Sequence, residues 1–337
     1  MTYECLDLCI TGYSSIHDSL VAKAAGRLHQ AYRPKTSSAH MSHLRLFIQF
    51  SQYTASPFPP ESPSSILAFM EFLHLNSISP PSISAYIHSL RSKFKALGLP
   101  VSHLYHHSIS LALRSFHLNV PHRQRTKGIF QISNIQAITA CASTLSLGYI
   151  YTPLFLLAFF AFLRLSNLVP VSPSAFSPRA HLCRGDIIFQ ENFATIIIKW
   201  SKTLQNQSKF ATVQIPALGS SSICPYAHLK ELFRRWPLPD NAPLFAVPQG
   251  QTFTILTQSQ VRKTLASILQ TLQIDPKSHP FHTFRRSGAS LAFSNNVSLQ
   301  AIQHHGTWTS DSVWNYIITS PTRQGSVVQS FRNLLHS

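Results

Sequence analysis

Two short segments near the end of the chain carry side chains that suit chemistry on a phosphate group. His282 and Arg285 stand three residues apart, at the expected start of a helix. Side chains at this spacing lie on one helix face, where a guanidinium can bind two anion oxygens and an imidazole can move a proton. Tyr316, in a polar segment further along, adds a phenol that could act as a nucleophile.

Two segments upstream place a cation where an anionic partner would be useful. Arg164 follows a run over 154–163 in which nearly every residue is apolar, which predicts a buried helix over about 152–164. A charge at the edge of a core is costly unless it is paired or bound to a ligand, although an arginine at a helix end can also reach solvent. Lys202 lies between two strand-like runs, 195–198 and 209–215, at the mouth of an expected β-hairpin. A lysine there can reach a substrate or simply remain solvated.

The first 120 residues predict helices joined by turns rich in proline and serine. We expect a first helix that is capped by Thr36 or Ser37 and runs to about residue 50. Further helices are expected over 63–73, from Pro80 to about residue 98, and over 101–118. The last two carry Arg91, Lys93, Lys95 and Arg114, which fit either a solvated helix face or contacts with a polyanion. A polar, basic stretch over 121–128 then predicts an interdomain linker in which Arg123, Arg125 and Lys127 lie on a phosphate backbone.

Residues from 129 onward predict a mixed domain. Helices are expected near 133–146, 152–164, 223–235, 258–272, 283–294, 298–304 and 310–319, with a short last helix over 326–335. A small antiparallel sheet is expected over 186–215, with Val213 and Ile215 on one face. The predicted fold class is therefore mainly α with a small antiparallel β-sheet (α+β), in two domains, 1–120 and 129–337.

The composition favours a polyanionic partner and gives no sign of a metal site. The 337 residues contain 28 Lys and Arg against 11 Asp and Glu, a net charge of +17, and each contact with a phosphate releases condensed counterions. The acidic residues are scattered, so no metal and no cofactor are expected. The five cysteines, at 5, 9, 141, 183 and 224, show no CxxC spacing and fit reduced intracellular thiols. The apolar run over 154–163 is about half of what a bilayer requires, so no membrane partner is expected.

In this order, Arg164, Lys202, His282, Arg285 and Tyr316 resemble the active site of the tyrosine recombinases, the phage-integrase superfamily of DNA breakage-and-joining enzymes. The segment 163–168 is similar to the family's first arginine box, except that this chain has an Asn where a Glu often stands. The segments 284–289 and 305–308 look most like recombinases of eukaryotic mobile elements, of the DIRS, Ngaro and Crypton types.

One position departs from the family pattern. Most members carry a His or Trp directly after a glycine that lies shortly before the nucleophilic tyrosine. Here Thr307 follows Gly306, and His305 and Trp308 flank the pair. Trp308 is the expected member of the site, because one residue of slack in a loop would let its indole donor reach the phosphate. His305 is the alternative.

The resemblance implies a mechanism. Tyr316 would attack a DNA phosphodiester, form a 3′-phosphotyrosyl link and free a 5′-hydroxyl. Arg164 and Arg285 would hold the non-bridging oxygens, Lys202 would be the general acid, and His282 would assist proton movement at the nucleophile.

The resemblance also implies partners and a place of action. A SAM-like helical core-binding domain and a catalytic domain would form a C-shaped clamp on double-stranded DNA, in a homo-oligomer that is a tetramer on paired sites. A role in mobile-element integration or excision implies an intracellular, nuclear location. A type IB topoisomerase and a catalytically silent DNA-binding derivative are the alternative functions.

Overall fold

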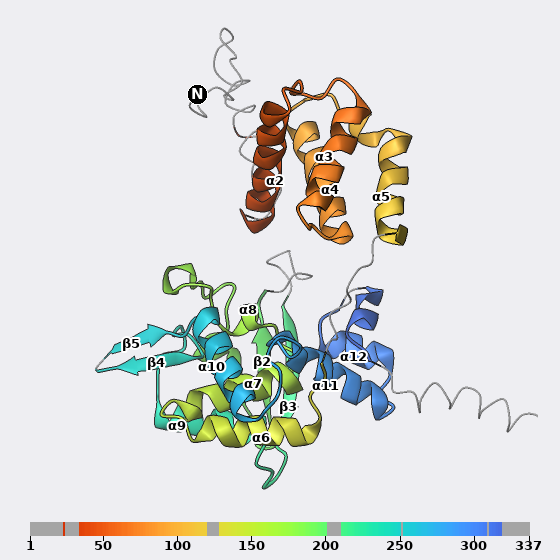
Figure 1. The fold of residues 1–337 in the computed structure, drawn as a ribbon. Helices are drawn as coiled ribbons and strands as arrows, with labels where there is room; N and C mark the ends of the chain where they lie inside the picture. The colour runs from red at the N-terminus through yellow and green to blue at the C-terminus, as the bar shows by residue number, and fades with distance from the viewer. Residues whose placement is uncertain are drawn as a thin grey trace, which may run out of the picture. The chain divides into compact units, whose positions relative to one another are not determined.

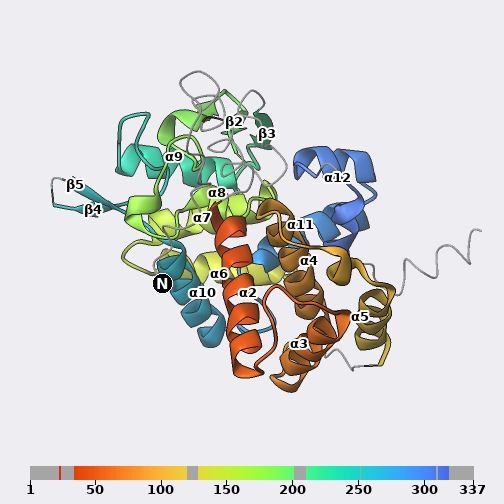
Figure 2. The same ribbon diagram turned by 90° about the horizontal axis from the view of Figure 1, so that it is seen from above.

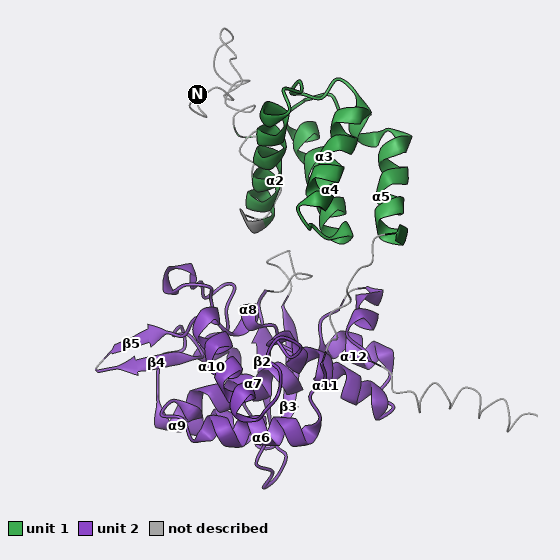
Figure 3. Cartoon of the chain, in the orientation of Figure 1, with its two compact units in different colours: residues 1–124 green, residues 125–337 purple. Residues whose placement is uncertain are grey.

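The computed structural model describes residue 23 and residues 34–119, 128–200, 210–250, 252–308 and 310–318. The chain divides into two compact units, residues 1–124 and 125–337 (Figure 3). Lys202, the basic residues Arg123, Arg125 and Lys127, and the last helix expected over 326–335 lie outside the described residues.

The described part of the first unit is helical. Its elements are α2 (Pro34–Tyr53), α3 (Pro63–Leu75), α4 (Pro80–Ala96), the 3-10 helix η2 (Ser102–Tyr105) and α5 (His107–Asn119). Prolines begin α3 and α4, as predicted, since the fixed φ of proline suits the first helical position and its missing N–H is not needed there. The core contains interlocking aromatic rings, among them Phe47 and Phe69, whose centroids lie 4.9 Å apart.

Two details of this unit differ from the prediction. Helix α2 already includes Pro34, so Thr36 and Ser37 lie inside its first turn and do not precede it. The helix expected over 101–118 is divided into η2 and α5, because His106 has an extended backbone between them. The Nδ1 atom of His106 accepts the backbone N–H of Ser108 at 3.3 Å, so this imidazole caps the start of α5.

The second unit is built around one buried helix. Its helices are α6 (Ile132–Ser143), α7 (Gly148–Phe160), α8 (Leu165–Leu168), α9 (Pro225–Arg235), α10 (Gln258–Thr271), α11 (His282–Ser294) and α12 (Leu299–His305). Every residue over 150–159 is buried, and α7 contacts α6, α9 and α11 (Figures 1 and 2). A helix that is apolar on all sides must be covered on all sides, which is why α7 forms the centre of this unit.

Two small antiparallel sheets complete the second unit. The first has the order β1 (Ile187–Phe189), β2 (Phe193–Ile198), β3 (Ala211–Pro216), and Ile198 opposite Ala211 is the last pair of the β2–β3 hairpin. Val213 and Ile215 are buried, as predicted. The second sheet, β4 (Ala246–Gln249) and β5 (Thr252–Ile255), was not predicted, because each strand has only 4 residues and β5 is largely exposed.

Two other elements of this unit end or form differently from the prediction. Helix α7 ends at Phe160 and not at Arg164, because Phe162 adopts a left-handed φ of 49° that no α-helix continues. Of the helix expected over 310–319, the described residues 310–318 form no α-helix; the structure has the 3-10 helix η5 (Asp311–Asn315) there, and Tyr316 follows it. Two further 3-10 turns, η3 (Pro173–Ala175) and η4 (Arg184–Asp186), precede β1. In the described ranges, no helix combines the length and apolarity that a membrane span requires.

Candidate active site

Helix α11 holds His282 and Arg285 against the central helix α7. Phe284, between them, is fully buried and its ring stacks on Phe155 with a centroid distance of 5.4 Å and an interplanar angle of 8°. One turn later, a Cβ on Gly288 would lie 2.3 Å from the carbonyl oxygen of Phe159. Only glycine permits this close approach of the two helices, so the position of the His–Arg pair is fixed by core packing.

Arg285 is buried, with only 2% of its surface exposed. Its Nη1 donates to the carbonyl of Phe162 and its Nη2 to the carbonyl of Gly306, the latter at 2.6 Å. Its guanidinium carbon lies 3.8 Å from the ring centroid of Trp308. Burial lowers the pKa of Arg285 to about 9, and the charge of Arg164 acts in the same direction. The guanidinium is therefore rigidly held and still cationic at neutral pH.

Three side chains surround the ring of Tyr316. The ring centroids of His282 and Trp308 each lie 5.0 Å from that of Tyr316, and the guanidinium carbon of Arg285 lies 5.4 Å from it. Two buried donors here, Nε of Arg285 and Nε1 of Trp308, have no hydrogen-bond partner within the described ranges. Buried donors are rarely left unpaired, so the arrangement suits an anion bound beside the phenol.

Tyr316 is attached to α11 by a residue that the sequence did not single out. The hydroxyl of Ser290 donates to the carbonyl of Tyr316 at 3.0 Å and accepts the backbone N–H of Ile318 at 3.0 Å. Ser290 is buried on α11, two turns after His282. A serine inside a predicted helix carries no sequence signal for such a role, because the contact joins segments far apart in the chain.

The structure places Trp308 beside Tyr316 and places His305 against Phe160 and Phe162. Thr307 adopts a left-handed φ of 55°, which turns the chain so that Trp308 reaches Tyr316 from one residue beyond the family's usual position. The Nε2 of His305 lies 2.7 Å from the carbonyl oxygen of Phe160, and its ring packs on Phe162. Burial lowers the pKa of His305, and its contacts with Phe160 and Phe162 make it a packing residue.

His282 is neutral in this setting. Its pKa is lowered to about 4, most of all by burial and also by the positive charges of Arg285, Arg164 and Arg286. A neutral imidazole can accept a proton, and the ring of His282 lies next to the phenol of Tyr316.

Arg164 lies just before the short helix α8 and is half-buried. The buried amide of Asn167 connects it to the sheet: Oδ1 accepts the backbone N–H of Arg164 at 3.3 Å, and Nδ2 donates to the carbonyl of Trp200 at 2.7 Å. Trp200 follows β2 and precedes Lys202 by two positions. The side chain of Asn167 thus holds both the turn at Arg164 and Trp200, at the start of the connection that carries Lys202.

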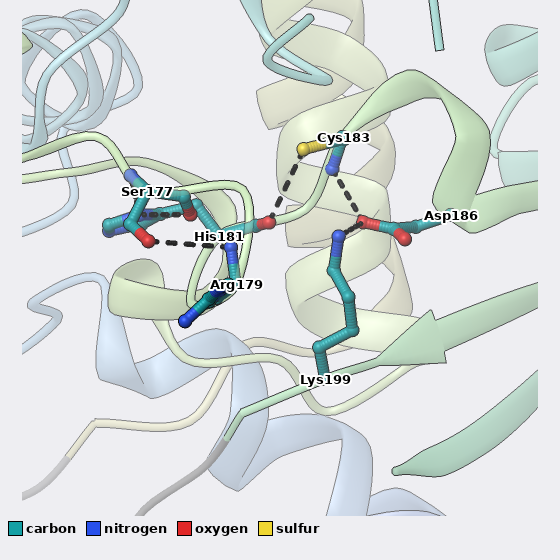
Figure 4. Close-up of polar contacts among 6 residues, drawn as sticks. All are labelled: Ser177, Arg179, His181, Cys183, Asp186 and Lys199. Atoms are coloured by element: carbon teal, nitrogen blue, oxygen red, sulfur yellow. Dashed lines mark hydrogen bonds and ion pairs between the residues drawn. The ribbon is translucent and has the colours of Figure 1, made fainter. Parts of the chain in front are cut away.

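Another lysine on the same hairpin, Lys199, has a different role. Its Nζ forms an ion pair with Oδ2 of Asp186 at 2.7 Å, and that oxygen also accepts the backbone N–H of Cys183 at 2.8 Å (Figure 4). The neighbouring turn is closed by His181, whose Nδ1 accepts the backbone N–H of Ser177 at 3.1 Å. Lys199 is therefore held by a carboxylate in a structural network.

The predicted DNA-contacting residues of the first unit differ in how they are held. Arg91 donates from Nε and Nη2 to the carbonyl of Leu104 at 3.0 and 2.8 Å, so its guanidinium braces η2. Arg91 and Lys95 both lie over the ring of Tyr105, at 4.7 and 4.9 Å from its centroid. Lys93 is half-buried and Arg114 is exposed.

The chain that follows the basic stretch is bonded to α11. The backbone N–H of Gly128 donates to the carbonyl of Ser278 at 3.0 Å, and Nη1 of Arg286 donates to the carbonyl of Gly128 at 3.0 Å. Ser287 accepts the backbone N–H of Phe130 at 2.8 Å. The start of the second unit is thus fixed to the helix that carries His282 and Arg285.

Comparisons with known proteins reveal the fold. No protein-family model matches the sequence, and no curated protein is similar to it in sequence. Solved structures are similar over most of the chain. One is XerH site-specific recombinase bound to palindromic difH substrate, a post-cleavage complex, with a TM-score of 0.62, 14% identity and coverage of 93% of this chain and 84% of that chain.

Two further structures agree. The Tn1549 transposon integrase in complex with transposon right end DNA has a TM-score of 0.66, 12% identity and coverage of 94% of this chain and 98% of that chain. A lambda integrase dimer bound to a core site has a TM-score of 0.56, 14% identity and coverage of 89% and 76%. The chain therefore has the fold of the tyrosine recombinases and integrases, mainly helical with small antiparallel sheets, as predicted.

Proposed function

We propose that this chain is a tyrosine recombinase that cuts and rejoins DNA through a 3′-phosphotyrosyl intermediate. The observation that carries the proposal is the cluster around Tyr316: His282 and Trp308 at 5.0 Å, Arg285 at 5.4 Å, and two buried donors without a partner within the described ranges. The fold supports it, because the three similar structures described above are a recombinase and two integrases.

The chemistry follows from the residue types. The phenol oxygen of Tyr316 attacks phosphorus, its proton passes to the neutral imidazole of His282, and the bond from phosphorus to the 5′-oxygen breaks. Arg164, Arg285 and Trp308 donate to the non-bridging oxygens, where negative charge grows in the transition state. Lys202 protonates the leaving 5′-oxygen. The new phosphotyrosyl ester keeps the energy of the broken one, so a 5′-hydroxyl from another strand can reverse the reaction without ATP.

The wider role is part of the same proposal. Residues 1–120 act as the core-binding domain and 129–337 as the catalytic domain, with 121–128 as the linker and double-stranded DNA as the partner. The enzyme works as a homo-oligomer, a tetramer on paired sites, in the nucleus, and it serves the integration or excision of a mobile element of the DIRS, Ngaro or Crypton type. The net charge of +17 supports a partner that is a polyanion.

Incubation with a nicked suicide substrate tests the chemistry, because loss of the short cleaved fragment traps the covalent complex. The substrate carries the terminal sequence of the element that encodes the protein. The unaltered protein should form a covalent adduct with DNA, and Tyr316→Phe should form none while binding the same DNA with nearly equal affinity. An adduct that persists in Tyr316→Phe contradicts the assigned nucleophile. Absence of any adduct supports a catalytically silent DNA-binding protein, and supercoil relaxation without sequence preference supports a type IB topoisomerase.

A further inference from the structure

The segment that carries Tyr316 is a short piece of irregular chain. Tyr316 follows the five-residue 3-10 helix η5, and its own backbone N–H is bonded only locally, to the carbonyl of Val313 at 2.8 Å. Val313 and Ile317 anchor the segment in a small apolar cluster with Phe162 and Trp308. Apolar contacts are not directional, so they hold the segment in place without fixing the direction in which the phenol faces.

Ser290 supplies two directional contacts to the backbone that follows the Cα of Tyr316. One hydroxyl donates to the carbonyl of Tyr316 and accepts the N–H of Ile318, both at 3.0 Å. The backbone groups that follow the Cα of Tyr316 are thereby fixed to α11, the helix that also carries His282 and Arg285. Ser290 is 3% exposed, so water does not compete easily for these two bonds.

We propose that Ser290 is a positioning residue that sets the attack geometry of Tyr316 by tying its backbone to the helix of the phosphate-binding residues. The inference rests on the proposed function. A hydroxyl is required because only a group that both donates and accepts can bridge a carbonyl and an N–H at one point. Ser290 touches no reacting atom, and its whole effect passes through the main chain of the nucleophile.

The matched control is Ser287, one turn earlier on the same helix. Its hydroxyl accepts the buried N–H of Phe130 at 2.8 Å and does not contact the nucleophile segment. Ser287→Ala and Ser290→Ala therefore remove the same group from α11 and each leave a backbone N–H without its acceptor. Ser290→Cys keeps a side chain of similar shape, although sulfur is somewhat larger than oxygen, and weakens both bonds, since a thiol is a poor donor and acceptor.

The test is single-turnover cleavage of the suicide substrate at saturating DNA, with thermal unfolding measured in parallel. Ser290→Ala should slow adduct formation between about tenfold and a hundredfold, Ser290→Cys less, and Ser287→Ala little, although Ser287→Ala should lower the melting temperature at least as much. Hydrogen exchange should show faster exchange at the Ile318 amide in Ser290→Ala and not in Ser287→Ala. Equal cleavage rates in Ser290→Ala and the unaltered protein, or equal losses in both alanine variants, would overturn the inference. Lack of an adduct in the unaltered protein overturns the proposed function instead.

Discussion

A Cβ on Gly306 would stand 1.8 Å from the ring of Trp308, so the indole occupies the place of the missing side chain. The same ring stacks on Arg285, whose Nη2 donates to the carbonyl of Gly306. Glycine is therefore needed at 306 for the space it leaves and not for its backbone freedom, because its φ of −87° suits any residue.

Gly306→Ala should displace the indole and disturb Arg285 in turn. We expect adduct formation at saturating DNA to fall by about tenfold or more, with a smaller change in DNA affinity. Gly250→Ala is a useful control for the added methyl, since a Cβ there meets no atom within 4 Å, although its φ of 59° makes that change mildly strained. Unchanged cleavage in Gly306→Ala would mean that the position of Trp308 does not matter.

The roles of Trp308 and His305 can be distinguished, because Trp308→Ala should mainly change the cleavage rate and His305→Ala should mainly change the melting temperature. Trp308→Ala removes a buried donor beside Tyr316 and should slow cleavage by about a hundredfold to a thousandfold. His305→Ala breaks the contact with the carbonyl of Phe160 and a ring contact with Phe162, so it should lower the melting temperature with less effect on the rate. Rates are compared at equal DNA occupancy. A larger rate loss from His305→Ala would reverse the assignment.

The general acid can be identified with a modified leaving group. Lys202→Ala should slow cleavage by about a hundredfold to ten thousandfold, and a substrate with a 5′-thiol leaving group, which needs little protonation, should restore much of that rate. Lys199→Ala is the matched control on the same hairpin. It breaks the ion pair with Asp186, so it should destabilise the fold. The 5′-thiol substrate should not restore its cleavage rate. Rescue of Lys199→Ala, and not of Lys202→Ala, would exchange the two roles.

The neutral histidines make a prediction about acid stability. Burial lowers the pKa of His282 to about 4 and also lowers the pKa of His305, His181 and His43. Such groups bind protons more readily in the unfolded chain, where the histidine pKa is about 6.5. The free energy of unfolding should therefore fall as pH decreases below about 6.5, and for His282 the loss should continue to about pH 4.

Urea unfolding at a series of pH values measures this loss, and His282→Gln should show a smaller one because glutamine does not titrate. At pH values well above about 6.5 these histidines are neutral in both states and contribute no pH dependence. A profile for His282→Gln that runs parallel to that of the unaltered protein would show that folding does not lower the pKa of His282.

Affinity for duplex DNA should depend steeply on salt. The log–log slope should be several units for a protein that covers many phosphates, and Lys95→Ala should reduce it by about one. Arg91→Ala should in addition lower the melting temperature, because Arg91 also braces the carbonyl of Leu104. A slope near zero in the unaltered protein would exclude an extensive DNA interface.

Local patterns explain what the sequence could predict. The apolar run of α7, the alternation of β3 and the prolines that begin α3 and α4 each act within a few residues, and the structure confirms all of them. Two of the features that were not predicted depend on distant contacts. Ser290 matters because of Tyr316, and the end of α7 is decided where Phe162 turns to offer its carbonyl to Arg285. The division of 101–118 at His106 depends on a local cap made by an imidazole, which is not one of the usual capping side chains.

The charges around His282 have a consequence for the protein without DNA. Every charged group that shifts the pKa of this residue is an arginine: Arg285, Arg164 and Arg286. Like charges held close together repel one another, and the amide of Asn167 adds no negative charge that could offset them. Under the proposed function, the scissile phosphate is therefore also the counterion of these arginines, and their charges are balanced only while DNA is bound.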